Sequence, residues 1–152
     1  MSATKSDNAQ TAFENSADLL NELAGFSGSM EWHRFNLDRR HLLTDGALYL
    51  AEKAGAFWLM DVIASYQGEA KFRGEDFQVW KIQMDAAPGR GCVVFADDGN
   101  GNELCRQVIE YTDFPDLSET VSSADTQTKE HFKLFAARNE LLGMTIMLPS
   151  EN

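Results

Sequence analysis

The sequence predicts a single α+β domain in which two or three helices pack against an antiparallel sheet of four or five strands. The chain has 152 residues, of which 43% are hydrophobic, and this suffices for one domain with a sizeable core. Apolar residues recur at helical spacing in the first half and alternate at strand spacing in the second half. We expect the polar, aperiodic residues 1–10 to form a flexible tail and residues 11–152 to form the domain.

The helical patterns come first along the chain. Residues 11–24 place apolar side chains every three or four positions, which predicts an amphipathic helix. Residues 30–43 alternate weakly and fit either a short strand or an irregular approach to the next helix. Thr44 is a good N-cap for that helix, and Gly55 is expected just beyond its end. Residues 56–66 are apolar nearly all round, which predicts a buried central helix.

Strand patterns follow. Residues 77–85 alternate between two faces, as a half-buried strand does. Residues 92–96 and 103–112 flank the turn sequence DDGNGN, and together they predict a hairpin. Pro115 lies in the turn sequence TDFPD and should prevent continued regular pairing.

The two cysteines fall on the two strands of this hairpin. A turn centred near residues 99 and 100 would place Cys92 opposite Gln107 and Cys105 opposite Val94. The thiols would then be diagonal neighbours on one face, and we expect them to be buried and free rather than joined in a disulfide.

The C-terminal region leaves two structures open. Residues 131–143 fit a helix, but residues 131–136 and 144–149 also fit two strands around a turn. The segment GMTIMLPSEN favours a final strand, with Pro149 ending it.

The charge of the chain is large and uneven. The net charge is −11, yet residues 31–96 hold nine acidic and eight basic side chains. Residues 97–125 hold eight acidic side chains against one basic residue, Arg106. Such a chain is a poor candidate for binding nucleic acid, which needs clustered lysine and arginine, and an acidic surface fits a basic protein instead. The candidate interaction face consists of three of these acids, Asp113, Asp116 and Glu119.

Membrane and secretory signals are not expected. No apolar run reaches the roughly 18 residues that a membrane-spanning helix needs. The segment MSATKSDNAQT is too polar to be a secretory signal. We therefore expect a cytoplasmic protein that has no membrane partner.

Three side chains in the helical half are candidates for a functional site. Asp61 is a lone carboxylate among apolar neighbours, so burial could raise its pKa and make it a general acid or base. The alternative is a structural carboxylate that accepts from a backbone amide or pairs with an arginine. Asp45 lies in the first turn after Thr44, where a negative charge suits the helix dipole. Trp58 precedes Asp61 by one turn and belongs to an aromatic set that is expected to fill the core.

No cofactor or metal is expected from the motifs. Asp98, Asn100 and Asn102 match the first three ligands of a calcium loop, but Glu103 stands where the loop needs glycine and Ile109 where it needs a chelating acid. The hairpin turn is the better interpretation, because Asp, Asn and Gly favour turns. The chain has no zinc spacing, nucleophile elbow or glycine-rich phosphate loop, so we assign no catalytic residue and no metal ligand.

Several sequence words together carry a resemblance. They are TDG, YLAEKAGAFWLMD, IASYQ, FQVWKI, DDGNGNEL, YTDFP and the terminal LPSE. With these, roughly residues 40–150 resemble an uncharacterised family of small bacterial and phage-borne proteins. The resemblance implies an origin in a mobile element and a final strand that ends in LPSE. It implies no catalytic or binding role.

The sequence therefore favours a non-enzymatic interaction or accessory protein that binds an unknown protein partner through an acidic face. Two alternatives stay open. One is a small enzyme that uses Asp61, Asp45 or a histidine in a pocket. The other is an acidic mimic of nucleic acid.

Overall fold

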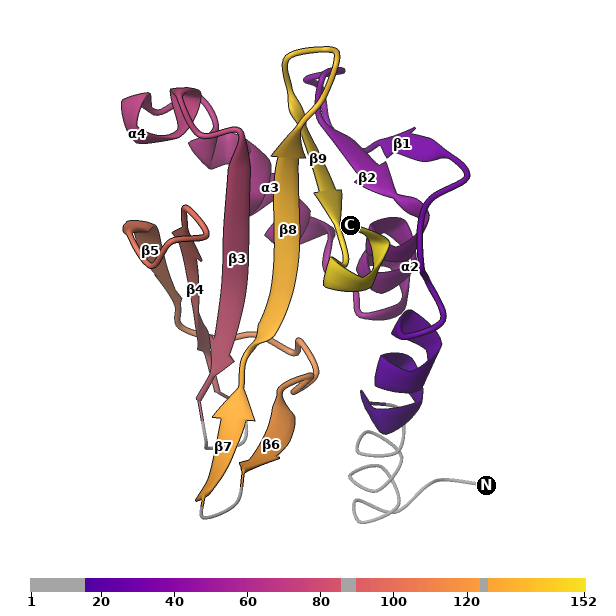
Figure 1. Cartoon of the computed structure of the whole chain (residues 1–152), viewed down its shortest axis with the longest axis vertical. Coiled ribbons are helices and arrows are strands. Elements are labelled where there is room, and N and C mark those ends of the chain that lie inside the picture. The colour runs from indigo at the N-terminus through magenta and orange to yellow at the C-terminus, as the bar shows by residue number, and fades with distance from the viewer. Residues whose placement is uncertain (1–15, 86–89, 124–125) are drawn as a thin grey trace.

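The computed structural model describes residues 16–85, 90–123 and 126–152 (Figure 1). The predicted tail at residues 1–10 and the start of the first predicted helix lie outside them. The helices are residues 16–23, α2 (Asp45–Lys53), α3 (Phe57–Tyr66), the short α4 (Ala70–Arg73) and a 3-10 turn, η1 (Pro149–Glu151). The strands are β1 (Trp32–Arg34), β2 (Leu42–Thr44), β3 (Phe77–Met84), β4 (Cys92–Asp97), β5 (Glu103–Ile109), β6 (Glu119–Ser123), β7 (Thr126–Glu130), β8 (Phe132–Arg138) and β9 (Met144–Met147).

Seven of the strands form one sheet in the order β1-β2-β9-β8-β3-β4-β5, while β6 and β7 form a separate two-stranded ribbon. Neighbouring strands are antiparallel except β2 and β9, which are parallel. In Figure 1, α3 lies behind β3 and β8, and α2 lies behind the β2–β9 side of the sheet. The predicted α+β class is confirmed, with a sheet larger than the expected four or five strands. No helix in the described ranges is long and apolar enough to cross a membrane.

The local signals around the second helix are confirmed. Thr44 caps α2, because its side-chain oxygen accepts a hydrogen bond from the amide of Ala47. Gly55 has a φ of 60° just beyond the C-cap residue Ala54, which is a conformation that glycine adopts without strain. Of the two structures left open before this helix, the chain forms the short strand β1.

The predicted buried central helix is only partly buried, which corrects the expectation for residues 56–66. Leu59, Met60 and Ile63 are buried, and they pack in the core cluster that also contains Trp80. The opposite side is exposed at residues 57, 61 and 65, which share one helical stripe. Uniform apolar composition therefore did not reveal which side of the helix faces the sheet.

The C-terminal region forms two strands rather than a helix. In β8, Leu134 and Ala136 are buried while their neighbours are partly exposed, which is the period-two pattern of a strand. All four residues of β9 are buried, because this strand lies between β2 and β8 in the sheet. The final strand ends at Met147. Leu148 of LPSE is the extended N-cap residue of η1, and the remaining three residues form that 3-10 turn, which corrects the implied ending.

The hairpin of β4 and β5 is confirmed, but its predicted register is wrong. Cys92 pairs with Ile109, and Cys105 pairs with Ala96. The turn is centred at residue 100, where Asp97 pairs with Glu103, and an irregularity at residues 96 and 97 shifts the pairing by one more residue. The two thiols are therefore four positions apart along the ladder and are both free. Burial raises the pKa of the Cys105 thiol to about 11, so it is a poor nucleophile near neutral pH.

Candidate functional site

Asp61 is neither a buried acid nor a tethered carboxylate. Its side chain is exposed on α3, and no hydrogen bond or ion pair joins it to any residue that the structure describes. Both interpretations offered for Asp61 required burial or a partner. The position provides neither among the described residues, so the expected burial is wrong, and a functional role for Asp61 stays a prediction.

Asp45 is a structural anchor. Its Oδ1 lies 2.8 Å from Nε2 of His33, and its Oδ2 accepts from the amide of Met30 at 2.9 Å. Its own amide donates to the hydroxyl of Ser29. The hydrogen bond from His33, followed by that from Met30, holds the pKa of Asp45 below its usual value. The Ser29 hydroxyl in turn donates to the Glu31 carbonyl. Together these contacts attach the segment before β1 to the start of α2.

The first and the last of the quoted motifs, TDG and LPSE, meet at the N-terminus of α2. Glu151 of LPSE accepts from the Thr44 hydroxyl at 2.6 Å and from the Gly46 amide at 3.0 Å, so both motifs cap α2. A Cβ at residue 46 would lie 2.5 Å from the Glu151 carboxylate oxygen, so any other residue there would displace this carboxylate from the cap. The motifs TDG and LPSE thus act together in folding.

Trp58 also has a packing role. It is half-buried, and its ring meets that of Phe114 edge to face with centroids 6.3 Å apart. Phe114 belongs to the motif YTDFP and is buried, so the contact fixes this segment against α3. Neither Trp58 nor Asp45 nor Asp61 lines either of the two cavities described below.

The motif DDGNGN is a closed turn. The Asp98 carboxylate accepts from the amides of Asn100 and Asn102 and from the side chain of Asn102. Two glycines of the turn, Gly99 and Gly101, have positive φ angles. The side chains of Asp98 and Asn102 are therefore used within the turn. The described residues include no group of three or more His, Cys, Asp or Glu that could hold a metal.

The acid-rich segment is divided between two places in the fold. Asp97, Asp98 and Glu103 lie at the β4–β5 turn, at one end of β5, and Glu110 follows the other end. Beyond Glu110, the chain contains the predicted interaction face, Asp113, Asp116 and Glu119, and reaches β6 at the lower end of the molecule in Figure 1. Carboxylates from other segments join it there. We call this region the acidic end and define it by the segments that lie there in Figure 1: the first helix, the end of β3, residues 110–119 and the end of β7. The described carboxylates of these segments are Asp18, Glu22, Asp85, Glu110, Asp113, Asp116, Glu119 and Glu130.

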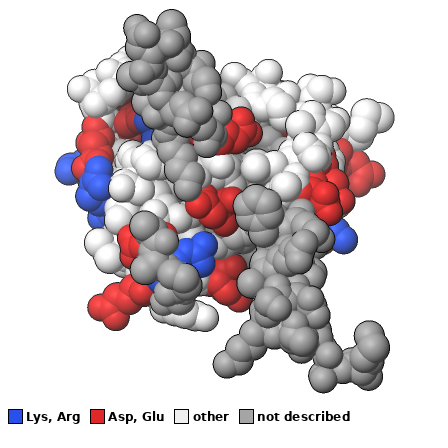
Figure 2. All heavy atoms as spheres, turned by 90° about the horizontal axis from the view of Figure 1, so that it is seen from below, with Lys and Arg blue, Asp and Glu red and all other residues white. Residues whose placement is uncertain are grey.

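Figure 2 views this end from below and shows several acidic groups with few basic ones between them. The basic residues described there are Arg90 and Lys133. Asp113 and Glu119 are exposed, and no ion pair joins either of them to a basic side chain within the described ranges. Asp116 is half-buried and accepts from the amide of Ser118, so it also holds the turn before β6.

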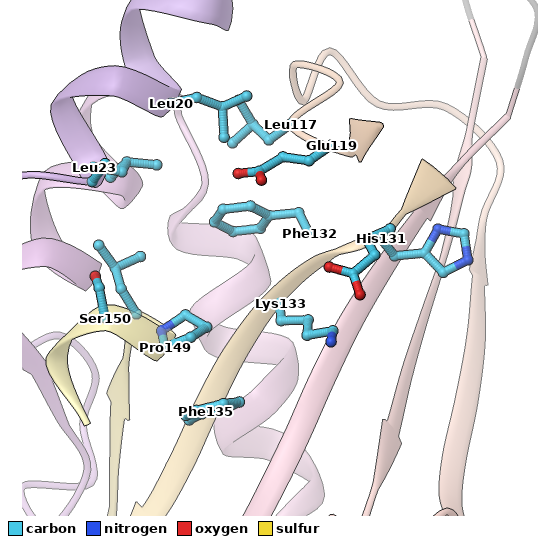
Figure 3. Close-up of a pocket in the computed structure, with 13 residues that line it drawn as sticks. Leu20, Leu23, Leu117, Glu119, His131, Phe132, Lys133, Phe135, Pro149 and Ser150 are labelled. Atoms are coloured by element: carbon cyan, nitrogen blue, oxygen red, sulfur yellow. The ribbon is translucent and has the colours of Figure 1, made fainter. Parts of the chain in front are cut away.

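An apolar groove of about 370 Å³ opens beside these acids. Its apolar residues come from the first helix, the segment before β6, β8 and the C-terminal turn, namely Leu20, Leu23, Ala24, Leu117, Phe132, Phe135, Leu148 and Pro149. Glu119, Glu130, His131 and Lys133 supply its charged and titratable residues. Figure 3 shows Glu119 and Phe132 pointing into the space between the first helix and η1, while the His131 ring points away from it.

A second cavity, of about 420 Å³, lies at the other end of β8 and is lined by Arg40, Arg73 and Arg138. Sequence reasoning missed it, since its lining comes from the loop before β2, the end of α3, α4 and the β8–β9 region. No short motif joins these segments, so no local signal identifies the cavity.

Comparisons with known proteins extend the resemblance seen in the motifs. A family of unknown function, DUF6876, matches residues 17–152. No curated protein and no solved structure matches the chain. The match covers all the motifs quoted above and nearly all of the residues that the structure describes. The chain therefore belongs to DUF6876, a family of unknown function.

Proposed function

We propose that this protein works by binding a basic partner protein at the acidic end, rather than by catalysis. The observation that carries the proposal is an apolar groove lined by Glu119 and Glu130, at the end of the molecule where the other segments of the acidic end lie. Carboxylates that face water without basic partners repel one another, and a basic partner relieves this repulsion.

The groove supports a more specific form of partner. Its floor offers apolar contact from Leu23, Phe132 and Leu148, and Glu119 and Glu130 stand beside that floor. Interfaces of this kind bury an apolar anchor at the centre and place charged contacts at the rim. We therefore expect the partner to present an apolar side chain flanked by lysine or arginine.

The Asp61 and Asp45 alternatives receive no comparable support. Asp45 is used in hydrogen bonds to the segment before β1, and Asp61 faces water on α3. A catalytic carboxylate needs a place beside it where a substrate can lie, and the two cavities lie elsewhere.

Charge reversal combined with affinity capture tests the proposal. The test variant carries Glu110→Lys, Asp113→Lys and Glu119→Lys, and it spares Asp116 because that residue holds a turn. The control carries Glu31→Lys, Glu69→Lys and Glu140→Lys, which are exposed residues outside the segments of the acidic end, so its net charge changes by the same amount. Both proteins and the unmodified chain are used to capture partners from the native host, which are identified by mass spectrometry.

We expect a basic protein to be captured by the unmodified chain and the control, and to be lost by the test variant. Its capture should also weaken as salt is raised from 50 to 300 mM, because exposed charges are screened. Equal capture by all three proteins would remove the acidic end from the function.

A further inference from the structure

The arginine-lined cavity stands out against the charge of the chain. Three guanidinium groups, those of Arg40, Arg73 and Arg138, face it together with one carboxylate, that of Asp38. The chain as a whole has a net charge of −11, so a locally positive cavity is contrary to its composition. The cavity of about 420 Å³ falls within the range of about 300–1,000 Å³ that is usual for small-molecule sites.

The Asp38 carboxylate does not cancel this positive charge, because it is already engaged. Arg40 donates to both of its oxygens, from Nε at 3.0 Å and from Nη2 at 2.8 Å. These side-chain bonds, helped by the Arg40 amide, hold the pKa of Asp38 well below its usual range. Asp38 and Arg40 thus form a neutral pair, and Arg138 is paired at 3.3 Å with Asp76, whose side chain is 85% exposed. Arg73 has no carboxylate partner among the described residues, so it leaves a net positive charge in the wall.

His41 completes the same wall without adding charge. Its Nδ1 accepts from the amide of Met144 at 3.1 Å, so Nε2 carries the proton and faces Asp38 Oδ2 at 3.3 Å. Both ring nitrogens are therefore used within the protein. His41 holds Asp38 in position, and the binding of a ligand falls to the arginines.

The two arginines are fixed but keep unused donors. Arg138 donates from Nη2 to the carbonyls of Arg73 and Glu75, each at 3.1 Å, and from Nε to Asp76 at 3.3 Å. Arg73 donates from Nε to the carbonyl of Gly68 at 3.1 Å. Nη1 of Arg138 and both terminal nitrogens of Arg73 make no hydrogen bond within the described residues. Donors held in place before binding lose little freedom when a ligand arrives.

We propose that this cavity binds the phosphate group of a small phosphorylated molecule through Arg73 and Arg138, with Arg40 at its edge. A guanidinium group presents paired N–H donors that match the oxygens of a phosphate. Leu142 and Ala64 also line the cavity and give the rest of such a molecule an apolar surface. This inference stands apart from the acidic end, because β8 separates the two by about 20 Å at roughly 3.3 Å per residue.

The test is a titration of the whole chain with inorganic phosphate and with glycerol 3-phosphate, at constant ionic strength set by sodium chloride. The side-chain Nε–H resonances of the arginines report the site directly, and the thermal midpoint reports binding independently. Arg73→Gln is the test variant, because its one side-chain hydrogen bond is at the surface and its loss should leave the fold intact. Arg39→Gln is the control, since Arg39 is exposed in the same region and does not line the cavity.

We expect both compounds to shift the resonances of Arg73 and Arg138 and to raise the thermal midpoint of the unmodified chain and of Arg39→Gln. Arg73→Gln should weaken the affinity about tenfold, as the loss of one charge-assisted hydrogen bond does. Tighter binding of glycerol 3-phosphate than of phosphate would show that the apolar wall contributes. The proposal is overturned if neither compound shifts these resonances beyond the sodium chloride control, or if both variants bind equally.

Discussion

The charged side chains at the two ends of β8 differ in sign and in their contacts. One end is the acidic end, and the other, which we call the arginine end, holds the cavity lined by Arg40, Arg73 and Arg138. At the acidic end, Asp113 and Glu119 face water, and the described residues offer them no basic partner. At the arginine end, Arg40, Arg73 and Arg138 each donate to a carboxylate or a backbone carbonyl. Charge at the arginine end therefore holds the fold together, whereas charge at the acidic end adds repulsion to it.

The contrast distinguishes charged groups that stabilise the fold from charged groups that are free to bind a partner. A fold gains little from exposed carboxylates that repel one another, and this is one ground for the proposal that they attract a basic partner. A fixed guanidinium group can do both, because its five donors can serve the backbone and still leave some for a ligand. Substitutions at the two ends should accordingly change stability in opposite directions.

Among substitutions of charged residues, the largest effect is expected from Arg138→Met, which keeps the apolar stem of the side chain and removes its donors. The carbonyls of Arg73 and Glu75 would lose their shared donor, and we expect a loss of about 2 kcal/mol in the free energy of unfolding. The ion pair with Asp76 adds little to this value, since Asp76 is 85% exposed. Denaturant unfolding measures the loss. Arg39→Met, an exposed neighbour of the cavity, is the control and should change stability by less than about 0.5 kcal/mol; equal effects would refute the structural role of Arg138.

The next largest effect is expected from pH, which should change the free energy of unfolding through His41 at the arginine end. Burial lowers the pKa of His41, so below its ordinary value of 6.5 the unfolded chain takes up a proton that the folded chain refuses. Stability contributed by neutral His41 is therefore present above pH 6.5 and is lost as the pH falls from 6.5 toward its folded pKa. Denaturant midpoints of the unmodified chain at pH 7.5 and 5.5 should differ in this direction, and His41→Gln should reduce the difference. A difference unchanged by His41→Gln would assign the effect to another group.

The acidic end should respond in the opposite direction. Glu119 stands directly opposite Glu130 in the β6–β7 ladder, and like charges in that position destabilise a strand pair. Glu119→Gln should therefore raise the free energy of unfolding by a few tenths of a kcal/mol at low salt. The gain should shrink in 0.5 M sodium chloride, where exposed charges are screened. Glu110→Gln removes the same charge outside the ladder, and it should give a smaller gain than Glu119→Gln.

The sequence predicted those parts of the fold that depend on neighbouring residues. Thr44 and Gly55 bounded α2 correctly, because an N-cap and a left-handed glycine are local requirements. The β4–β5 hairpin was predicted from its turn, but its register was wrong for two reasons. The turn is centred at residue 100 and not between residues 99 and 100, and the irregularity at residues 96 and 97 leaves no mark in composition. Residues 131–143 fitted two periodicities, and the pairing of β8 with β3 decides between them.

The sites were harder to predict, because they depend on distant segments. Glu151 completes the cap of α2 from 105 residues away, and the arginine cavity joins segments that share no motif. Asp113, Asp116 and Glu119 were chosen from charge alone. Their part in binding stays a prediction, whereas the other carboxylates gathered around them could be recognised only from the fold.

Asp61→Asn should give the smallest effect, and it tests whether the charge contrast is confined to the two ends. Asp61 faces water from the middle of α3, outside both the acidic end and the arginine cavity. The change should alter the free energy of unfolding by less than about 0.5 kcal/mol, as is usual for an exposed side chain without partners. Ile63→Ala, on the buried side of the same helix, is the matched comparison and should lower stability by roughly 2–5 kcal/mol. A large loss of stability on Asp61→Asn would mean that this carboxylate has a partner in the folded protein. If Asp61→Asn leaves stability unchanged but abolishes partner capture, the binding surface extends from the acidic end onto α3.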